Sequence, residues 1–207
     1  GQTFQMVKEH IGNDDPYYDI RHFYNQMFLE HRESFQDKIN HSQDEFITAV
    51  KYAVIGNIID FNPVHNHDIK DIMKWFEKVD QLDFRINHID ELKSDLKNAK
   101  TLLYLGDNCG EICLDYLLIE KIKAINPHIE IYFGVRGQPV VNDSIAEDAY
   151  SIGMDQYAKI ISNGDGSLGT ILKRTSPEFQ NVYQKADVVI AKGQANYESL
   201  SEEVEKN

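Results

Sequence analysis

Three polar, glycine-containing segments carry side chains whose types and spacing suit chemistry on a phosphate group. They read GDNCGE (106–111), RGQPVVND (136–143) and KGQANYE (192–198). The first offers the Asp107 carboxylate and the Asn108 amide oxygen, and hard divalent cations prefer oxygen ligands of this kind. Gly110 permits a tight turn, and Glu111 then falls in the first turn of a helix, where free N–H groups can hold an anion. The same residue types also favour a helix N-cap, so this segment alone leaves both interpretations open.

The second segment adds a carboxylate and a cation. Asp143 would complete an oxygen set with Asp107 and Asn108, and Arg136 suits bidentate pairing with a phosphate. Asn142 or Asp143 also suits the N-cap of the helix expected next, and capping does not exclude metal binding.

The third segment supplies a lysine directly after an apolar run. The Lys192 ammonium would neutralise phosphate oxygens as charge develops, although a strand-end lysine that reaches water is the plain alternative. Gly193 allows close backbone approach, and Asn196 offers an amide. Ser167, in SNGDGSLG (162–169), is a further candidate phosphate contact, but that segment lacks the Gly-Lys-Ser/Thr ending of a P-loop.

These residues together predict metal-assisted hydrolysis of a small phosphorylated metabolite. Asp107, Asp143 and Glu111 are each candidates for the acid–base carboxylate, and the sequence does not choose among them. One alternative is an S-adenosylmethionine-dependent methyltransferase, because YLGDNCGE (104–111) has a strand followed by a glycine turn. Another is a protein that binds metal and phosphate without turnover.

A sheet is needed to bring the three segments together. Apolar runs at 101–105, 129–135, 157–161 and 187–191 predict strands, and Glu111–Ile125 has helical spacing. Strands that alternate with helices predict a mostly parallel sheet, and continuous apolar strands suit a sheet covered on both faces. We therefore expect a three-layer α/β/α Rossmann-like fold, with the segments at the carboxyl ends of its strands.

Residues 1–99 predict a helical portion that precedes this α/β domain, which spans residues 100–207 and carries the metal site. Apolar residues with helical spacing recur at 46–54 and 69–76. The first such stripe comprises Ile20, Phe23, Tyr24, Met27 and Phe28.

Composition narrows the class of protein. The 207 residues are 42% hydrophobic and carry a net charge of −13, which favours a globular protein and argues against nucleic-acid binding. No apolar run approaches the ~20 residues that span a bilayer, and the start is not a signal peptide, so we expect a cytoplasmic protein without a membrane partner. Cys109 and Cys113 lie four apart and fit reduced core residues. A homo-oligomer is compatible with the sequence.

The three segments, in this order and spacing, resemble the domain-of-unknown-function-89 family, also called damage-control phosphatases, in its prokaryotic-type branch. DPYYDIRHFYNQ (15–26) and GNIIDF (56–61) resemble the helical portion of that family. The resemblance implies an α/β/α Rossmann-like domain with a helical N-terminal portion. It also implies a phosphatase that depends on Mg, Mn, Co or Ni and acts on phosphometabolites such as sugar phosphates and phosphopantetheine-type compounds.

The resemblance also implies roles for individual residues. The metal ligands would be Asp107, Asn108 and Asp143, and Lys192 would be the phosphate-binding lysine. Other residues would lie in or beside the pocket, or approach it from the helical side: Glu111, Asn142, Gly193, Asn196, Asn57 and Asp60. Members of this branch begin with a Cys-x-x-Cys segment and continue beyond the equivalent of Glu198, so we expect a form that lacks N- and C-terminal segments.

Overall fold

The four apolar runs form one parallel sheet. The computed structural model describes Met6, residues 15–59 and residues 68–201. Its strands are β1 (Thr101–Leu105), β2 (Glu130–Val135), β3 (Lys159–Ser162) and β4 (Val188–Ala191), and they lie in the order β3-β2-β1-β4. The predicted α/β class and parallel sheet are confirmed, and each strand lies within two residues of its predicted bounds.

The strand order reverses between β1 and β4. The chain runs outward from β1 to β2 and β3, and then returns to the other side of β1. Leu105 is level with Gly134 on one side and with Ala191 on the other, so β1, β2 and β4 end close together. In open α/β sheets, a ligand crevice forms where the strand order reverses in this way.

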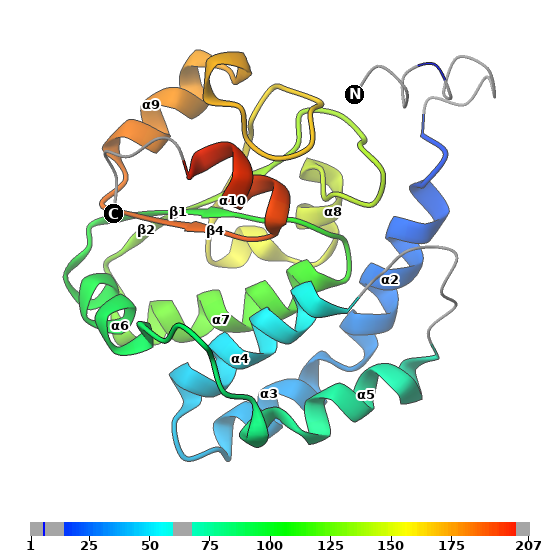
Figure 1. Ribbon diagram of the computed structural model, residues 1–207, viewed down its shortest axis with the longest axis vertical. Coiled ribbons are helices and arrows are strands. Elements are labelled where there is room, and N and C mark those ends of the chain that lie inside the picture. Colours follow the sequence, from blue (N-terminus) through cyan, green and yellow to red (C-terminus); the bar gives the residue numbers. More distant parts are fainter. Residues whose placement is uncertain (1–5, 7–14, 60–67, 202–207) are drawn as a thin grey trace.

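Helices cover both faces of the sheet (Figure 1). Alternate residues of β1 point to opposite faces: Leu102 and Tyr104 belong to a different hydrophobic cluster from Leu103 and Leu105. The first face packs on α7 (Glu111–Ile125) and, beyond it, α4 (Glu45–Ile58). The second face packs on α9 (Pro177–Lys185), with α10 (Gln194–Leu200) beside it. The remaining helices are α2 (Tyr18–Glu30), α3 (Arg32–Asn40), α5 (Ile69–Glu77), α6 (Ile89–Asn98) and α8 (Ala146–Ser151).

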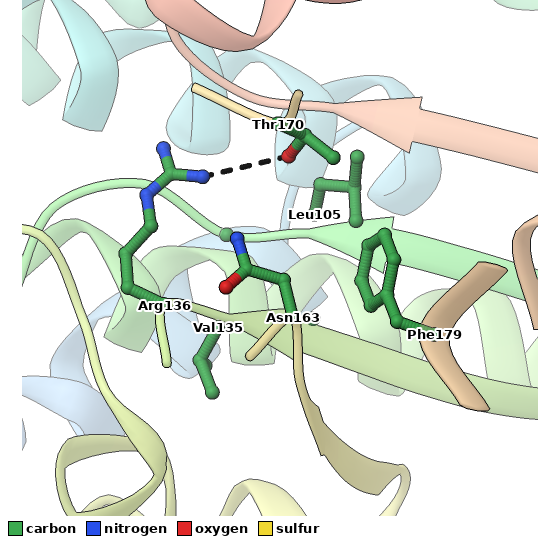
Figure 2. Close-up of a pocket in the computed structure, with 8 residues that line it drawn as sticks. Leu105, Val135, Arg136, Asn163, Thr170 and Phe179 are labelled. Atoms are coloured by element: carbon green, nitrogen blue, oxygen red, sulfur yellow. Dashed lines mark hydrogen bonds between the residues drawn. The ribbon is translucent and has the colours of Figure 1, made fainter. Parts of the chain in front are cut away.

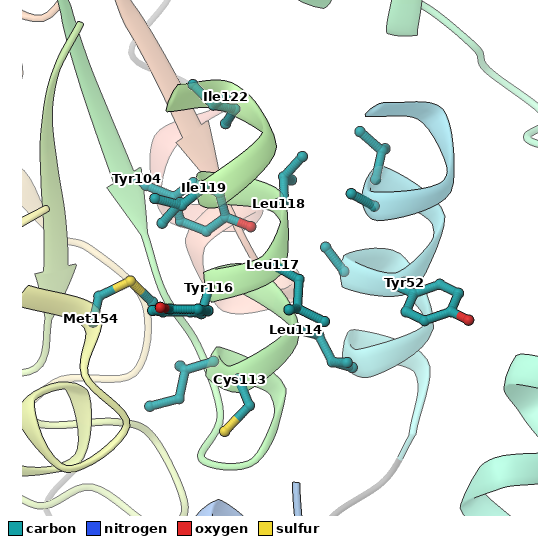
Figure 3. Packing of buried hydrophobic residues seen from close by; sticks show 14 of the residues in the cluster. Tyr52, Tyr104, Cys113, Leu114, Tyr116, Leu117, Leu118, Ile119, Ile122 and Met154 are labelled. Carbon is teal, nitrogen blue, oxygen red and sulfur yellow. The ribbon is translucent and has the colours of Figure 1, made fainter. Parts of the chain in front are cut away.

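Helix α7 lies at the centre of the larger hydrophobic cluster. Leu114, Leu117 and Leu118 are buried between the sheet and α4, which runs alongside (Figure 3). A Cβ atom at Gly56 of α4 would lie 2.7 Å from a methyl group of Leu114, so this glycine permits the close approach of the two helices. The described helices before residue 99 and the α/β part therefore share one core.

The buried face of α2 differs from the predicted stripe. Phe23 is 57% exposed, whereas the polar side chains of Arg21 and Asn25 are each 1% exposed. Apolar spacing predicted the helix correctly, but it placed Phe23 on the buried face. Arg21 and Asn25 are buried there because hydrogen bonds satisfy their polar groups.

Two further observations concern the class of protein. Cys109 and Cys113 are buried and free, as predicted. Within the described ranges, none of the helices combines the length and apolar character needed to cross a membrane.

Candidate active site at the carboxyl ends of β1 and β4

The loops that follow β1 and β2 are bound directly to each other. The backbone N–H and the hydroxyl of Ser144 both donate to the Asp107 carbonyl, at 2.8 and 3.0 Å. Cys109 N–H donates to the Asn142 carbonyl at 2.9 Å, and Asn108 forms an isolated bridge with Asp143. The structure thus brings the three predicted metal ligands together from segments that lie 35 residues apart in the chain.

These side chains are not helix caps. Gly110, with φ +79°, is the N-cap residue of α7, and no side chain caps that helix. The N-cap residue of α8 is Ile145, so the alternative in which Asn142 or Asp143 caps the next helix is wrong. Asn108 instead donates its side-chain N–H groups to Asp107 at 3.0 Å and to Glu111 at 3.1 Å.

Two buried cations each pair with two carboxylates at this edge of the sheet. Arg136 lies 2.7 Å from Asp143 and 3.8 Å from Asp107. Lys192 Nζ lies 2.7 Å from Glu111 and 2.6 Å from Asp115. We call this set the carboxylate cluster, and its members are Asp107, Glu111, Asp115, Asp143, Arg136 and Lys192. Four carboxylates against two cations leave the cluster two negative charges in excess when all groups are ionised.

The side chain of Lys192 does not extend into water, so the plain alternative of a solvent-exposed strand-end lysine is not observed. Its side chain is buried, and Nζ also donates to the Ala53 carbonyl of α4 at 3.0 Å. Burial by itself lowers the pKa of a lysine, but the charges of Asp115 and Glu111 outweigh it and raise the pKa of Lys192. Lys192 therefore carries its charge at neutral pH.

A buried tyrosine hydrogen-bonds to one of the two carboxylate partners of Lys192. The Tyr104 hydroxyl donates to Asp115 Oδ1 at 2.6 Å, and both residues are fully buried. Burial, opposed by the charge of Lys192, raises the pKa of Asp115 to about 6. Sequence reasoning missed both residues. The signal lay in LLYLGDNCGEICLD (102–115), where one hydroxyl and one carboxylate interrupt otherwise apolar core positions.

Arg136 is held from several sides. Its Nε atom donates to Asp143, and its Nη1 atom donates to the Gly169 carbonyl at 2.7 Å and to Asn196 at 3.2 Å. It also reaches the Thr170 hydroxyl beside a small pocket that leaves no room for a water molecule (Figure 2). The buried Nη2 atom makes no hydrogen bond among the described residues, but it already lies 3.8 Å from Asp107 Oδ1. A bidentate contact with a phosphate is therefore not available to Arg136 in this arrangement.

Asp107 is enclosed by α4 and by the start of α10. The side chain of Asn57 in α4 donates to Asp107 Oδ2 at 3.1 Å and to Glu111 Oε1 at 3.1 Å. A Cβ atom at Gly193, which has φ +85°, would lie 2.1 Å from Asp107 Oδ2. Burial, followed by the charges of Glu111 and Asp143, raises the pKa of Asp107 to about 7.

The donor set fits a divalent cation. Asp107, Asn108 and Asp143 offer two carboxylates and one amide carbonyl, which are ligands for Mg²⁺ or Mn²⁺, and two positive charges would balance the excess of the carboxylate cluster. In the described part of the chain, no group of three or more His, Cys, Asp or Glu side chains is placed to hold a metal ion. An ion here would therefore depend on the Asn108 amide and on ligands that do not come from the protein.

The other predicted residues occupy different positions. Asn196 is fully buried. It donates to the Lys192 carbonyl at 2.7 Å and accepts from Thr170 and Arg136, so it holds residues of the site in position. Ser167 is half-buried in the loop after β3, and no hydrogen bond among the described residues joins it to the carboxylate cluster. Asp60 lies outside the described residues.

Comparison with known proteins gives a consistent result. A family model described as the damage-control phosphatase ARMT1-like domain matches residues 1–207. The chain is 36% identical to a damage-control phosphatase of Pyrococcus horikoshii over 199 residues, which cover 96% of this chain and 67% of the relative. It is 32% identical to a damage-control phosphatase of Archaeoglobus fulgidus over 201 residues, which cover 96% and 68%.

Two further relatives extend this comparison. An uncharacterized protein of Methanocaldococcus jannaschii is 35% identical over 207 residues, which cover 98% of this chain and 66% of the relative. The crystal structure of a DUF89 family protein from Pyrococcus horikoshii superimposes with a TM-score of 0.85 at 36% identity, and the match covers 96% of this chain and 68% of that one. The chain thus spans about two thirds of the length of the relatives it matches.

Proposed function

The chain belongs to the damage-control phosphatase ARMT1-like domain family, and from this premise we propose that it hydrolyses the phosphate ester of a small phosphorylated metabolite with the help of a divalent metal ion. One observation carries the proposal. Asp107, Asn108, Asp143 and Lys192 converge where the strand order reverses, in a cluster that has two negative charges in excess when all its groups are ionised.

The metal ion would be held by Asp107, Asn108 and Asp143, with Mg, Mn, Co or Ni as the candidates. When bound, such an ion polarises a phosphoryl oxygen and positions or activates a water molecule. Arg136 would hold Asp143 in place through its Nε bond, which leaves the other carboxylate oxygen for the ion.

Lys192 would bind the phosphate group. Its ammonium is held by Glu111, Asp115 and the Ala53 carbonyl, so its position is fixed before an anion arrives, and a phosphate oxygen would replace one of these three acceptors. Gly193 has no side chain beside Asp107, and this would let the phosphate approach the backbone after β4. Sugar phosphates and phosphopantetheine-type compounds are the substrate classes to examine first.

Glu111 would organise the site. Its carboxylate accepts from Asn57, Asn108 and Lys192, and so links the proposed metal ligands to the proposed phosphate-binding lysine. Together with Asp107 and Asp143 it remains a candidate for the acid–base carboxylate.

The test is release of inorganic phosphate from a panel of phosphorylated metabolites with each of the four metals in turn. Asp107→Asn should abolish turnover, and Lys192→Met should lower it by about 100-fold or more. The matched controls are Asp37→Asn and Lys159→Met, because both side chains are exposed and pair with residues outside the carboxylate cluster. They should behave as the unmodified chain.

Calorimetry separates the alternatives. Binding of Mn²⁺ and inorganic phosphate without turnover of any substrate would favour a non-catalytic binding protein. Binding of S-adenosylmethionine would favour a methyltransferase. If the folded chain neither binds a metal nor releases phosphate, the proposed function is wrong.

A further inference from the structure

Helix α2 carries a buried polar network that reaches both loops of the candidate site. Arg21 and Asn25 lie on its inner face, one turn apart, and are each 1% exposed. Their partner is Asp148 of α8, which lies 127 and 123 positions away in the sequence. Both residues come from DPYYDIRHFYNQ, a segment with no role in the proposed chemistry.

Asn25 binds the loop that follows β1. Its Oδ1 atom accepts from Gly110 N–H at 2.8 Å, two residues after Asn108. A Cβ atom at Gly110 would lie 3.1 Å from Tyr24, so α2 packs closely against this turn. The turn that ends the proposed metal-binding segment is therefore hydrogen-bonded to α2.

The other end of the Asn25 side chain binds the second loop. Its Nδ2 atom donates to Asp148 Oδ1 at 3.1 Å. Asp148 Oδ2 in turn accepts from Ile145 N–H at 3.0 Å, two residues after Asp143, and from Arg21 Nε at 3.3 Å. One amide side chain thus spans the two loops from the helical side.

Burial of such groups is not an efficient source of stability. Arg21 also forms a bidentate pair with the partly exposed Asp15, at 2.6 Å for both bonds, and the pairing of a buried guanidinium gains little over apolar packing because desolvation opposes it. Geometric specificity is the better-supported use of a buried polar network, and these bonds end at two backbone N–H groups beside the proposed metal ligands.

We propose that Asn25 and Asp148 are positioning residues that fix the distance between the Asp107–Asn108 segment and Asp143, and so set the affinity of the site for its metal ion. This inference rests on the proposed function for the identity of the ligand. The hydrogen bonds of Ser144 and Cys109 join the two loops directly. The Asn25–Asp148 pair joins them a second time, through α2 and α8.

An exchange of the two side chains tests the proposal. Asn25→Asp places two carboxylates against each other and breaks the bridge. In the double variant Asn25→Asp/Asp148→Asn, the carboxylate at position 25 accepts from Gly110 N–H and from the amide at position 148. That amide still offers an oxygen to Ile145 N–H and Arg21, so both the charge and the hydrogen bonds are restored.

Two readouts apply, namely Mn²⁺ affinity by calorimetry and amide hydrogen exchange at Gly110 and Ile145 without metal. Asn25→Asp should weaken Mn²⁺ binding about 10- to 100-fold and speed exchange at both amides, and the double variant should restore both values to near those of the unmodified chain. Gln26→Glu, the same chemical change on the exposed face of α2, should alter neither.

The outcomes are distinguishable. The inference is overturned if Asn25→Asp lowers only the melting temperature, or if the double variant binds Mn²⁺ no better than Asn25→Asp. If the unmodified chain binds Mn²⁺ but releases no phosphate, the proposed function fails while the inference stands. If it binds no Mn²⁺, unchanged exchange at Gly110 and Ile145 in Asn25→Asp overturns the inference.

Discussion

At the level of single residues, any side chain at position 193 would occupy the space of the Asp107 carboxylate. A methyl group at position 193 would lie 2.1 Å from Asp107 Oδ2, far inside van der Waals contact, and the backbone φ of +85° also disfavours any side chain. The observed position of the Asp107 carboxylate therefore requires a residue without a side chain at position 193.

We therefore expect Gly193→Ala to displace Asp107 and to lower both Mn²⁺ affinity and phosphate release by about 100-fold. The control is Gly153→Ala, because Gly153 has φ +78° but its nearest side-chain atom is 3.7 Å from an added Cβ. The control should lose about 1 kcal/mol of unfolding free energy and keep its metal affinity. Equal effects of the two substitutions on metal binding would show that backbone strain, not displacement of Asp107, is responsible.

The Tyr104 hydroxyl supports the partner of Lys192. Tyr104→Phe leaves one oxygen of a buried carboxylate with a single partner, and the other oxygen of Asp115 already has none. We expect the free energy of unfolding to fall by about 1–3 kcal/mol, measured by chemical denaturation. Tyr157→Phe, which removes a half-buried hydroxyl bound to Glu120, should cost less than this. A loss at Tyr157 as large as that at Tyr104 would contradict the argument from burial.

At the scale of elements, the loop from β2 to α8 carries local strain. Val141 has φ +49°, a conformation that a β-branched residue rarely adopts, and it immediately precedes Asn142 and Asp143. The hydrogen bond from Cys109 N–H to the Asn142 carbonyl holds the backbone there. The bonds that align the two loops thus impose this conformation on Val141.

Replacement of Val141 by a residue that tolerates this conformation should stabilise the protein. We expect Val141→Asn to raise the free energy of unfolding by about 1 kcal/mol in chemical denaturation. Val141→Thr keeps the branched Cβ and should give no gain. If the threonine variant gains as much as the asparagine variant, relief of strain is not the cause.

Helix α2 shows the limits of periodicity at this scale. Its apolar spacing predicted a helix correctly, but the inner face includes Arg21 and Asn25 in place of Phe23. The spacing of residues along a helix indicates a face only where burial is governed by hydrophobicity, and here partners on α8 and at Gly110 decide it.

At the scale of the whole molecule, the two cysteines report on global opening. Cys113 lies deep in the shared core, and burial raises the pKa of its thiol, so little thiolate is present at pH 8. Cys109 is equally buried. We expect neither thiol of the folded chain to react with an aromatic disulfide reagent over minutes, and both to react at once in denaturant. Fast reaction of either thiol in the folded chain would show that the core opens locally.

The amino-acid sequence alone predicts the four strands, the helices among the described residues before 99 and the three polar segments that follow strands, because short-range spacing and residue type encode each of these. It also indicated Asp107, Asn108, Asp143 and Lys192 as residues that belong together, since parallel strands place their carboxyl ends at one edge.

The folded structure is needed to establish the strand order, the ion pairs of Lys192 and Arg136, and the bridge from Asn25 to Asp148. These depend on contacts between residues as much as 139 positions apart, as between Lys192 and Ala53, and no local pattern encodes such a pairing. Buried polar side chains take whatever partner the packing of helices brings within about 3 Å, so their roles emerge only when the fold is complete.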